Sequence, residues 1–166
     1  TNIWYCGSGE VDGVSASKSY SAFYYGSGIY KSTDKGETWT HLESTSTLVN
    51  KASDWEAVFR VLVDPTRFDS NIVFAATKKG IMRSNDGGLT WKQSLKANNA
   101  SYTDLSVTTS GVCFAAISSD GGGNVRGFWR STDGVNWVNI TASNFPSNHT
   151  RTLLAVYPSD ENRVYF

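Results

Sequence analysis

Three short turns of the chain place an aspartate where it can accept several hydrogen bonds or bind a cation. The first Asp turn reads STDKGETW (32–39), the second SNDGGLTW (84–91) and the third STDGVNW (131–137). Each supplies one carboxylate and a few hydroxyl groups, whereas protein-bound Ca²⁺ takes roughly six to eight oxygen ligands. An aspartate in a turn accepts hydrogen bonds from backbone amides that follow it, and glycine supplies the positive φ such turns need. We therefore expect these aspartates to fasten their turns and to bind no metal.

Other carboxylates of the chain raise the possibility of glycosidic-bond cleavage. Such cleavage uses two carboxyl groups about 5 to 10 Å apart on either side of the scissile bond. Glu10 or Asp12, together with Asp54 or Glu56, could supply the pair, but nothing in their spacing identifies them. The sequence therefore singles out no catalytic residue.

The two histidines offer no alternative chemistry. His41 and His149 lie in different parts of the chain and lack the partner spacing of a zinc site or of a catalytic triad. We therefore expect neither a metal nor a cofactor.

The composition predicts an all-β protein with many turns. The 166 residues include 6 Trp, 8 Tyr, 8 Phe and 15 Gly, and Ser and Thr are frequent. Lys and Arg together number 15, as do Asp and Glu, so the formal net charge is zero. A neutral chain lacks the electrostatic attraction that nucleic acids require. No apolar run approaches the roughly 20 residues that cross a bilayer, so we expect no membrane insertion.

The Asp turns are part of a longer repeat. They recur after 52 and 47 residues, counted from Asp34 to Asp86 and from Asp86 to Asp133. A second phrase keeps this period, because VLVDPTRFDSNIVFAAT (61–77) matches LAVYPSDENRVYF (154–166). Each unit reads as four short antiparallel strands, which in roughly 40 to 50 residues is the size of one β-propeller blade.

The repeat divides the chain into blades. We expect a half blade over 1–42, blades over 57–95 and 102–141, and a half blade over 151–166. Propellers usually have about four blades or more, so we interpret the chain as part of a larger propeller whose remaining blades are its partners. The alternative is that the two half blades come together and close a smaller ring.

The phrase Ser-x-Asp-x-Gly-x-Thr-Trp resembles the Asp-box, or BNR repeat, of β-propeller proteins. The first two turns match it fully, and the third is one residue shorter with Asn136 in place of Thr. Proteins with this repeat include sialidases, xyloglucanases, sortilin-type receptors, a photosystem II assembly factor and large secreted proteins of Bacteroidetes-type bacteria, which this chain resembles most. The matching positions are Ser32, Asp34, Gly36, Thr38, Trp39, Ser84, Asp86, Gly88, Thr90, Trp91, Ser131, Asp133, Gly134 and Trp137.

The long loops all fall on the face opposite the Asp turns, because connections in an antiparallel blade alternate between its two ends. They span 7–28, 43–57, 118–127 and 141–151. Binding residues concentrate on loops that a rigid scaffold positions. The candidate binding residues on this face are Glu10, Asp12, Tyr20, Tyr24, Tyr25, Asp54, Trp55, Glu56, Arg126 and His149.

These features favour a non-catalytic, secreted or cell-surface propeller that acts as a scaffold or binds a glycan or a protein. The alternative is a fragment of a sialidase-like or xyloglucanase-like glycoside hydrolase. The chemistry of sialidases uses three arginines, a tyrosine nucleophile and an aspartic acid, and their FRIP-like signature is missing from the chain.

The two cysteines are predicted to stay unpaired. Cys6 and Cys113 fall in strands of blades that are not neighbours, and a disulfide needs Cα atoms within about 7 Å. We expect two free, buried thiols.

Overall fold

A computed structural model describes residues 2–13, 22–47, 54–67, 71–98, 100–118, 125–157 and 159–166. Over these residues the chain is all-β apart from the 3-10 turn Glu43–Thr45 and the 3-10 residue Val125. No helix in the described part is long and apolar enough to span a membrane.

Two four-stranded antiparallel sheets form the centre of the molecule. The second sheet has the order β6-β7-β8-β9 and the third has the order β10-β11-β12-β13. Their strands are β6 (Val58–Val63), β7 (Val73–Thr77), β8 (Gly80–Ser84), β9 (Lys92–Lys96), β10 (Thr103–Val107), β11 (Cys113–Ile117), β12 (Gly127–Ser131) and β13 (Val138–Asn139).

Smaller sheets flank the two central ones. The first sheet has the order β1-β4-β5, a hairpin joins β2 to β3, and the last sheet contains β14 and β15. Their strands are β1 (Trp4–Gly7), β2 (Glu10–Gly13), β3 (Ala22–Tyr24), β4 (Ile29–Ser32), β5 (Thr40–His41), β14 (Ala155–Val156) and β15 (Val164–Tyr165).

The second strands of the central sheets are buried over their whole length because neighbouring sheets cover both of their faces. VFAAT of β7 and CFAAI of β11 have no exposed residue. Their alanines let the sheets approach closely, while the large side chains fill the space between the sheets. One core cluster between the second and third sheets contains Phe74, Ile81, Leu105 and Ile117.

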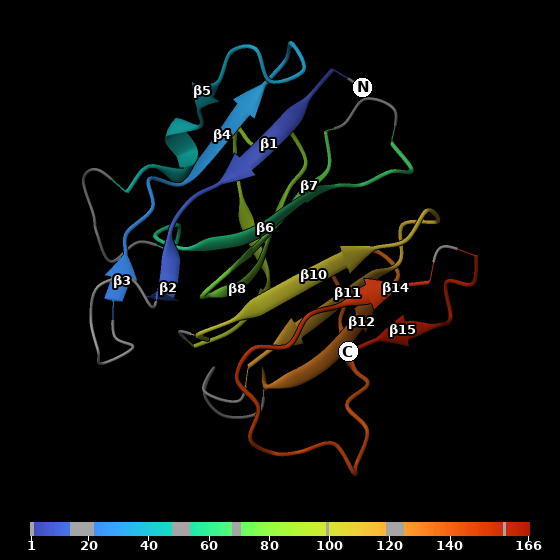
Figure 1. Cartoon of the computed structure of the whole chain (residues 1–166). Helices are drawn as coiled ribbons and strands as arrows, with labels where there is room; N and C mark the ends of the chain where they lie inside the picture. The colour runs from blue at the N-terminus through green and yellow to red at the C-terminus, as the bar shows by residue number, and fades with distance from the viewer. Residues whose placement is uncertain are drawn as a thin grey trace.

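The sheets follow one another in chain order (Figure 1). Strand β6 packs beside β1 on one side and β10 on the other, and β10 also packs beside β14. The first strands of the second, third and last sheets, β6, β10 and β14, are thus neighbours, and a residue at one register in β6 lies near its counterpart in β10.

Alternate connections place the Asp turns and the β6–β7 turn at the same end of the sheets. The amide of Gly87 in the second Asp turn donates to the carbonyl of Asn71, which precedes β7, at 2.8 Å. The connections β1–β4, β5–β6, β11–β12 and β13–β14 leave from the opposite end.

Both cysteines are free, but the expectation that both are buried is wrong for one of them. Cys113 lies in the core between sheets, whereas Cys6 is exposed. Cys6 shares a face of β1 with Trp4, which is also exposed, and in the described part of the chain no further sheet covers that face. Burial raises the pKa of the Cys113 thiol to about 12.

Candidate functional site

The first two Asp turns are closed by hydrogen bonds to their own carboxylates. Asp86 accepts the Thr90 hydroxyl at 2.6 Å, the Thr90 amide at 2.8 Å and the Ser84 hydroxyl at 2.8 Å. Asp34 accepts the same three groups in the first turn. The threonine hydroxyl and amide lower the pKa of both carboxyl groups to about 2.

The third Asp turn is also closed by hydrogen bonds to its own carboxylate, although it is one residue shorter. Asp133 accepts the amides of Asn136 and Val135 at 2.7 and 2.8 Å, and the Asn136 side-chain amide at 2.7 Å. The backbone amides lower the pKa of this carboxyl group. All three carboxylates are therefore occupied by donors of their own turns, and the described residues contain no cluster of three potential metal ligands.

A groove of about 640 Å³ crosses the loop-bearing ends of the first strands. Its walls come from consecutive sheets: Phe59 and Arg60 belong to β6, and the segments around Tyr102 and Arg151 lead into β10 and β14. Glu10 of the hairpin closes one side. The guanidinium of Arg151 lies 5.6 Å from the centre of the Tyr102 ring, and the rings of Phe59 and Tyr102 are 6.0 Å apart. The groove thus combines aromatic surfaces with charged groups.

Two lining residues of this groove, Arg60 and Asp104, form an ion pair. Nε of Arg60 lies 2.5 Å from a carboxylate oxygen of Asp104, which is 6% exposed. The second oxygen of Asp104 accepts the backbone amide of Leu154 at 2.7 Å. One buried carboxylate therefore links the first strands of three successive sheets.

A second hollow of about 540 Å³ shares Gly9 and Glu10 with the groove. It is lined by Tyr24 and Tyr25, which are 46% and 62% exposed. Three of the predicted binding residues, Glu10, Tyr24 and Tyr25, are thus brought together beside the groove. Asp12 lies in β2, but its side chain, like the whole of Tyr20, lies outside the described residues.

Two predicted binding residues are buried, so their interpretation as part of a binding face is wrong. Trp55 is 8% exposed, and its ring packs edge-on against Trp91 at 4.9 Å. Glu56 is 2% exposed and forms an ion pair with Lys78. The segment is held inward because the Glu56 carbonyl accepts the amide of Gly26 at 2.8 Å.

The remaining candidates lie apart from the groove. Arg126 and His149 line a separate hollow of about 370 Å³ together with Phe145. His149 contacts the carbonyls of Pro146 and Ile117 through its two ring nitrogens. Asp54 is half-buried, and its charge acts on Lys78. The predicted face is thus divided among separate surfaces.

Sequence reasoning missed the groove residues on the first strands, Phe59, Arg60, Tyr102, Asp104 and Arg151. A signal for two of them was present. Arg60 pairs across the sheet with Ala76 and Asp104 with Ala116, so opposite charges stand at the same register of consecutive repeats.

Comparison with known proteins identifies the architecture. No protein-family model and no curated protein matches the chain. Solved structures do match: the Niastella koreensis GH74 enzyme superposes with a TM-score of 0.61 over 82% of this chain, at 23% identity. The chain has a β-propeller fold. An ancestral GH74 enzyme gives 0.57 at 22% identity over 85% of this chain, and the GH74 xyloglucanase from Xanthomonas campestris gives 0.55 at 15% over 87%.

These likenesses concern the fold alone, at identities below 25%. The chain spans about a fifth of the length of the matched structures, which is 21%, 19% and 21% of the three chains. The four-stranded sheets are therefore blades, and the groove crosses the innermost strands of successive blades.

Proposed function

We propose that this chain is part of a secreted or cell-surface β-propeller that binds a neutral glycan chain in the groove over its innermost strands, without cleaving it. The observation that carries the proposal is the lining of the groove. Phe59 and Tyr102 offer flat apolar surfaces to the faces of sugar rings, while fixed charged groups beside them can bond hydroxyl groups. Its volume of about 640 Å³ lies within the range of protein ligand sites, roughly 300 to 1,000 Å³.

The charges of the groove favour a neutral ligand. Arg60 and Arg151 are balanced by Glu10 and Asp104 among the described lining residues. A polyanion would gain from the two arginines but would be repelled by the exposed carboxylate of Glu10. A β-linked glucan backbone, which carries hydroxyl groups and no charge, meets no such repulsion.

The carboxylates of the groove argue against hydrolysis. The described lining residues include two of them, Glu10 and Asp104. Asp104 is buried, paired with Arg60 and bonded to the Leu154 amide, so both of its oxygens are committed to the protein. A glycosidase needs a second carboxylate facing the substrate.

A second candidate function is a glycoside hydrolase, and the likeness to GH74 enzymes is the specific observation in its favour. Because the chain spans about a fifth of those proteins, it would hold only part of such an active site.

A glycan array followed by a hydrolysis assay tests the proposal. The array carries xyloglucan, β-glucan and sialylated oligosaccharides, and we expect retention on the neutral β-glucans. Tyr102→Ala should lose that retention, whereas Tyr157→Ala should keep it, because Tyr157 is exposed and does not line the groove. Release of reducing sugar from xyloglucan that disappears in Glu10→Gln would favour the hydrolase instead. No retention on any glycan would refute the proposal.

A further inference from the structure

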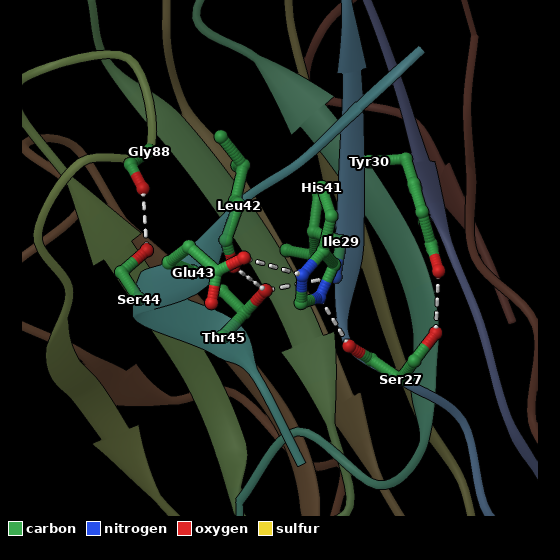
Figure 2. A network of polar contacts seen from close by, with 9 residues as sticks. All are labelled: Ser27, Ile29, Tyr30, His41, Leu42, Glu43, Ser44, Thr45 and Gly88. Carbon is green, nitrogen blue, oxygen red and sulfur yellow. Dashed lines mark hydrogen bonds and ion pairs between the residues drawn. The ribbon is translucent and has the colours of Figure 1, made fainter. Parts of the chain in front are cut away.

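The second Asp turn is recognised by polar groups of the blade that precedes it. The Ser44 hydroxyl donates to the carbonyl of Gly88 at 2.7 Å (Figure 2). The neighbouring carbonyl of Gly87 accepts both the Tyr5 hydroxyl and the Lys31 ammonium, each at 3.1 Å. Burial raises the pKa of Tyr5 to about 12, so its hydroxyl keeps the proton that it donates.

The third Asp turn packs against the second blade through a hydroxyl group as well, although Ser94 lies in β9 and Ser44 lies in the 3-10 turn that follows β5. Ser94 donates to the carbonyl of Gly134 at 2.6 Å, as Ser44 does to its glycine. Phe74 and Arg83 face each other across β7 and β8, at the register that the Tyr–Lys pair holds in the first blade. A Cβ atom at Gly134 would lie 2.4 Å from the Phe74 ring, which shows how closely turn and blade fit.

The two interfaces differ in the length of the turn. The Gly88 amide donates to the hydroxyl of Ser84, four residues earlier. The Gly134 amide donates to the hydroxyl of Ser131, only three residues earlier.

Gly134 resembles Gly88 in this amide bond, and it resembles Gly87 in its φ of +66° and in facing an aromatic side chain of the preceding blade, here Phe74. The third turn thus has one glycine where the second has two, and its one glycine carbonyl accepts Ser94, so it has no second glycine carbonyl for a tyrosine and a lysine.

The preceding blade matches this difference. Where the acceptor carbonyl is present, the blade offers a tyrosine hydroxyl and a lysine. Where the carbonyl is missing, the blade has Phe74, which has no hydroxyl to satisfy, and Nε of Arg83 is buried without a hydrogen-bond partner. A buried hydroxyl without an acceptor would be costly, so tyrosine suits the full-length turn and phenylalanine the short one.

The first Asp turn has the full-length form, and among the described residues no other blade covers its docking face. Its Lys35 amide donates to the Asn2 carbonyl at 3.0 Å, as the amide of Gly87 does in the second turn. Trp39 is 42% exposed and Gly36 is half-buried, whereas the glycines of the other two turns are buried. The atoms nearest to a Cβ at Gly36 belong to the rings of Trp4 and Trp39 of the same blade.

We propose that the first Asp turn is the docking surface for a further propeller blade that presents a tyrosine and a lysine or arginine to the Lys35 carbonyl, and a hydroxyl group to the Gly36 carbonyl. The proposal rests on the continuity of the interface that the other two turns make. It extends the function proposed above but does not depend on glycan binding.

A second copy of this chain does not fit as the occupant. The Tyr–Lys pair of a second copy already holds its own second Asp turn. The pair that follows in the third blade is Phe114 opposite Arg130, which matches a short turn.

A mutant cycle within the natural chain tests the rule that tyrosine suits a full-length Asp turn and phenylalanine a short one. Tyr5→Phe removes one donor and deletion of Gly87 removes its acceptor. We expect Tyr5→Phe to lower the Tm by about 2 to 4 °C in the full-length turn, the effect of one lost hydrogen bond in a chain of this size. In the chain lacking Gly87 the same substitution should leave the Tm unchanged or raise it. An equal loss in both backgrounds would overturn the rule.

An extended chain tests the docking surface itself. Residues 58–112 are placed directly before residue 4, so that a copy of the second blade precedes the first Asp turn in register. We expect Trp39 to become less accessible to acrylamide in the extended chain. We also expect the extended chain with Phe74→Tyr in the added copy to have a Tm a few degrees higher than the extended chain with an unmodified copy. Deletion of Lys35 should reverse this preference. Unchanged quenching of Trp39, or the same order of Tm with and without Lys35, would overturn the proposal. So would dimers of the unextended chain that Trp39→Ser abolishes, because the occupant would then be a second copy.

Discussion

Carboxylates of this chain differ in the groups that donate to them, and this decides what each can do. Those of the Asp turns are occupied by amides and hydroxyls close in sequence. Glu161 instead accepts the Ser110 hydroxyl, the Thr109 hydroxyl at 2.6 Å and the Ser110 amide at 2.9 Å. The two hydroxyl groups, that of Ser110 first, lower its pKa to about 2. Glu161 thereby joins the β10–β11 turn to the β14–β15 turn of the next blade. Glu10, exposed at the groove, is the carboxylate placed to meet a ligand.

Acid should destabilise the fold through the Asp turns. The folded pKa of Asp86 is about 2 against an ordinary value of 3.8, so its stabilising effect is complete above about pH 4 and is lost as the pH falls toward 2. The Thr90 hydroxyl is the largest cause, and we expect Thr90→Val to lower the Tm at pH 7 and to flatten its fall between pH 4 and 2. Thr90→Ser, which keeps the hydroxyl, serves as the control. Thermal unfolding from pH 2 to 7 measures both, and identical pH profiles for the two variants would refute this role.

The Asp104 ion pair should contribute to stability because three blades meet at it. Asp104→Ala leaves the buried Leu154 amide and the Arg60 guanidinium without their acceptor. We expect a loss of about 1 to 3 kcal/mol in the free energy of unfolding, measured by urea denaturation. Arg60→Ala should cost less, because the Arg60 side chain is 40% exposed and the aspartate keeps its amide donor. Equal costs would show that the pair, and not the amide, dominates.

The two thiols should differ in reactivity. Cys6 is exposed and should react with a thiol reagent in the folded protein, while the buried Cys113, with its raised pKa, should not. Titration should therefore count one thiol in the native state and two after denaturation without reductant. A count of zero after denaturation would mean that the cysteines are paired.

Each Asp turn is formed by residues close in sequence, and the second and third are then held in place by packing against the preceding blade. A glycine that follows the aspartate of the second and third Asp turns allows the positive φ of the turn, and its missing side chain lets the preceding blade approach. At Gly88 a Cβ would lie 2.6 Å from Leu42, and at Gly134 it would lie 2.4 Å from Phe74. The same glycine thus serves the turn and the packing between blades.

Alanine substitutions can separate these two roles of glycine. Gly134→Ala and Gly87→Ala meet similar strain, since their φ angles are +66° and +70°. Only Gly134→Ala also meets an aromatic ring, whereas the atom nearest to a Cβ at Gly87 is the flexible Lys31 ammonium at 3.0 Å. We expect Gly134→Ala to cost about 1 to 3 kcal/mol more than Gly87→Ala in the free energy of unfolding. Equal losses in chemical denaturation would mean that packing against Phe74 is not limiting.

The strands and turns of the blades could be predicted from sequence because their signals are local. Alternating apolar runs and the Asp phrase each specify a few consecutive residues. The groove could not be found in the same way, since Arg60, Tyr102 and Arg151 meet only when three blades lie side by side. Trp55 was misassigned because an aromatic residue in a loop looks exposed until the loop is known to fold back onto Trp91.

At the scale of the molecule, the blades place their first strands β6, β10 and β14 side by side. Figure 1 shows the order of these strands along the chain. The groove is lined by β6, by β10 and by the segment before β14, and Glu10 of the β2–β3 hairpin also lines it. Glycan binding at this place needs residues from three successive blades. We therefore expect affinity to depend on the packing of the blades as well as on the aromatic side chains.

The most direct test of this account is titration calorimetry of the chain with a xyloglucan oligosaccharide, with Tyr102→Ala and Tyr157→Ala measured beside it. The account predicts binding by the unaltered chain and by Tyr157→Ala, at least a tenfold loss of affinity in Tyr102→Ala, and no change in the oligosaccharide after prolonged incubation. A tenfold loss corresponds to about 1.4 kcal/mol, within the range expected for one aromatic contact. Equal affinities in all three proteins, or cleavage of the oligosaccharide, would contradict it.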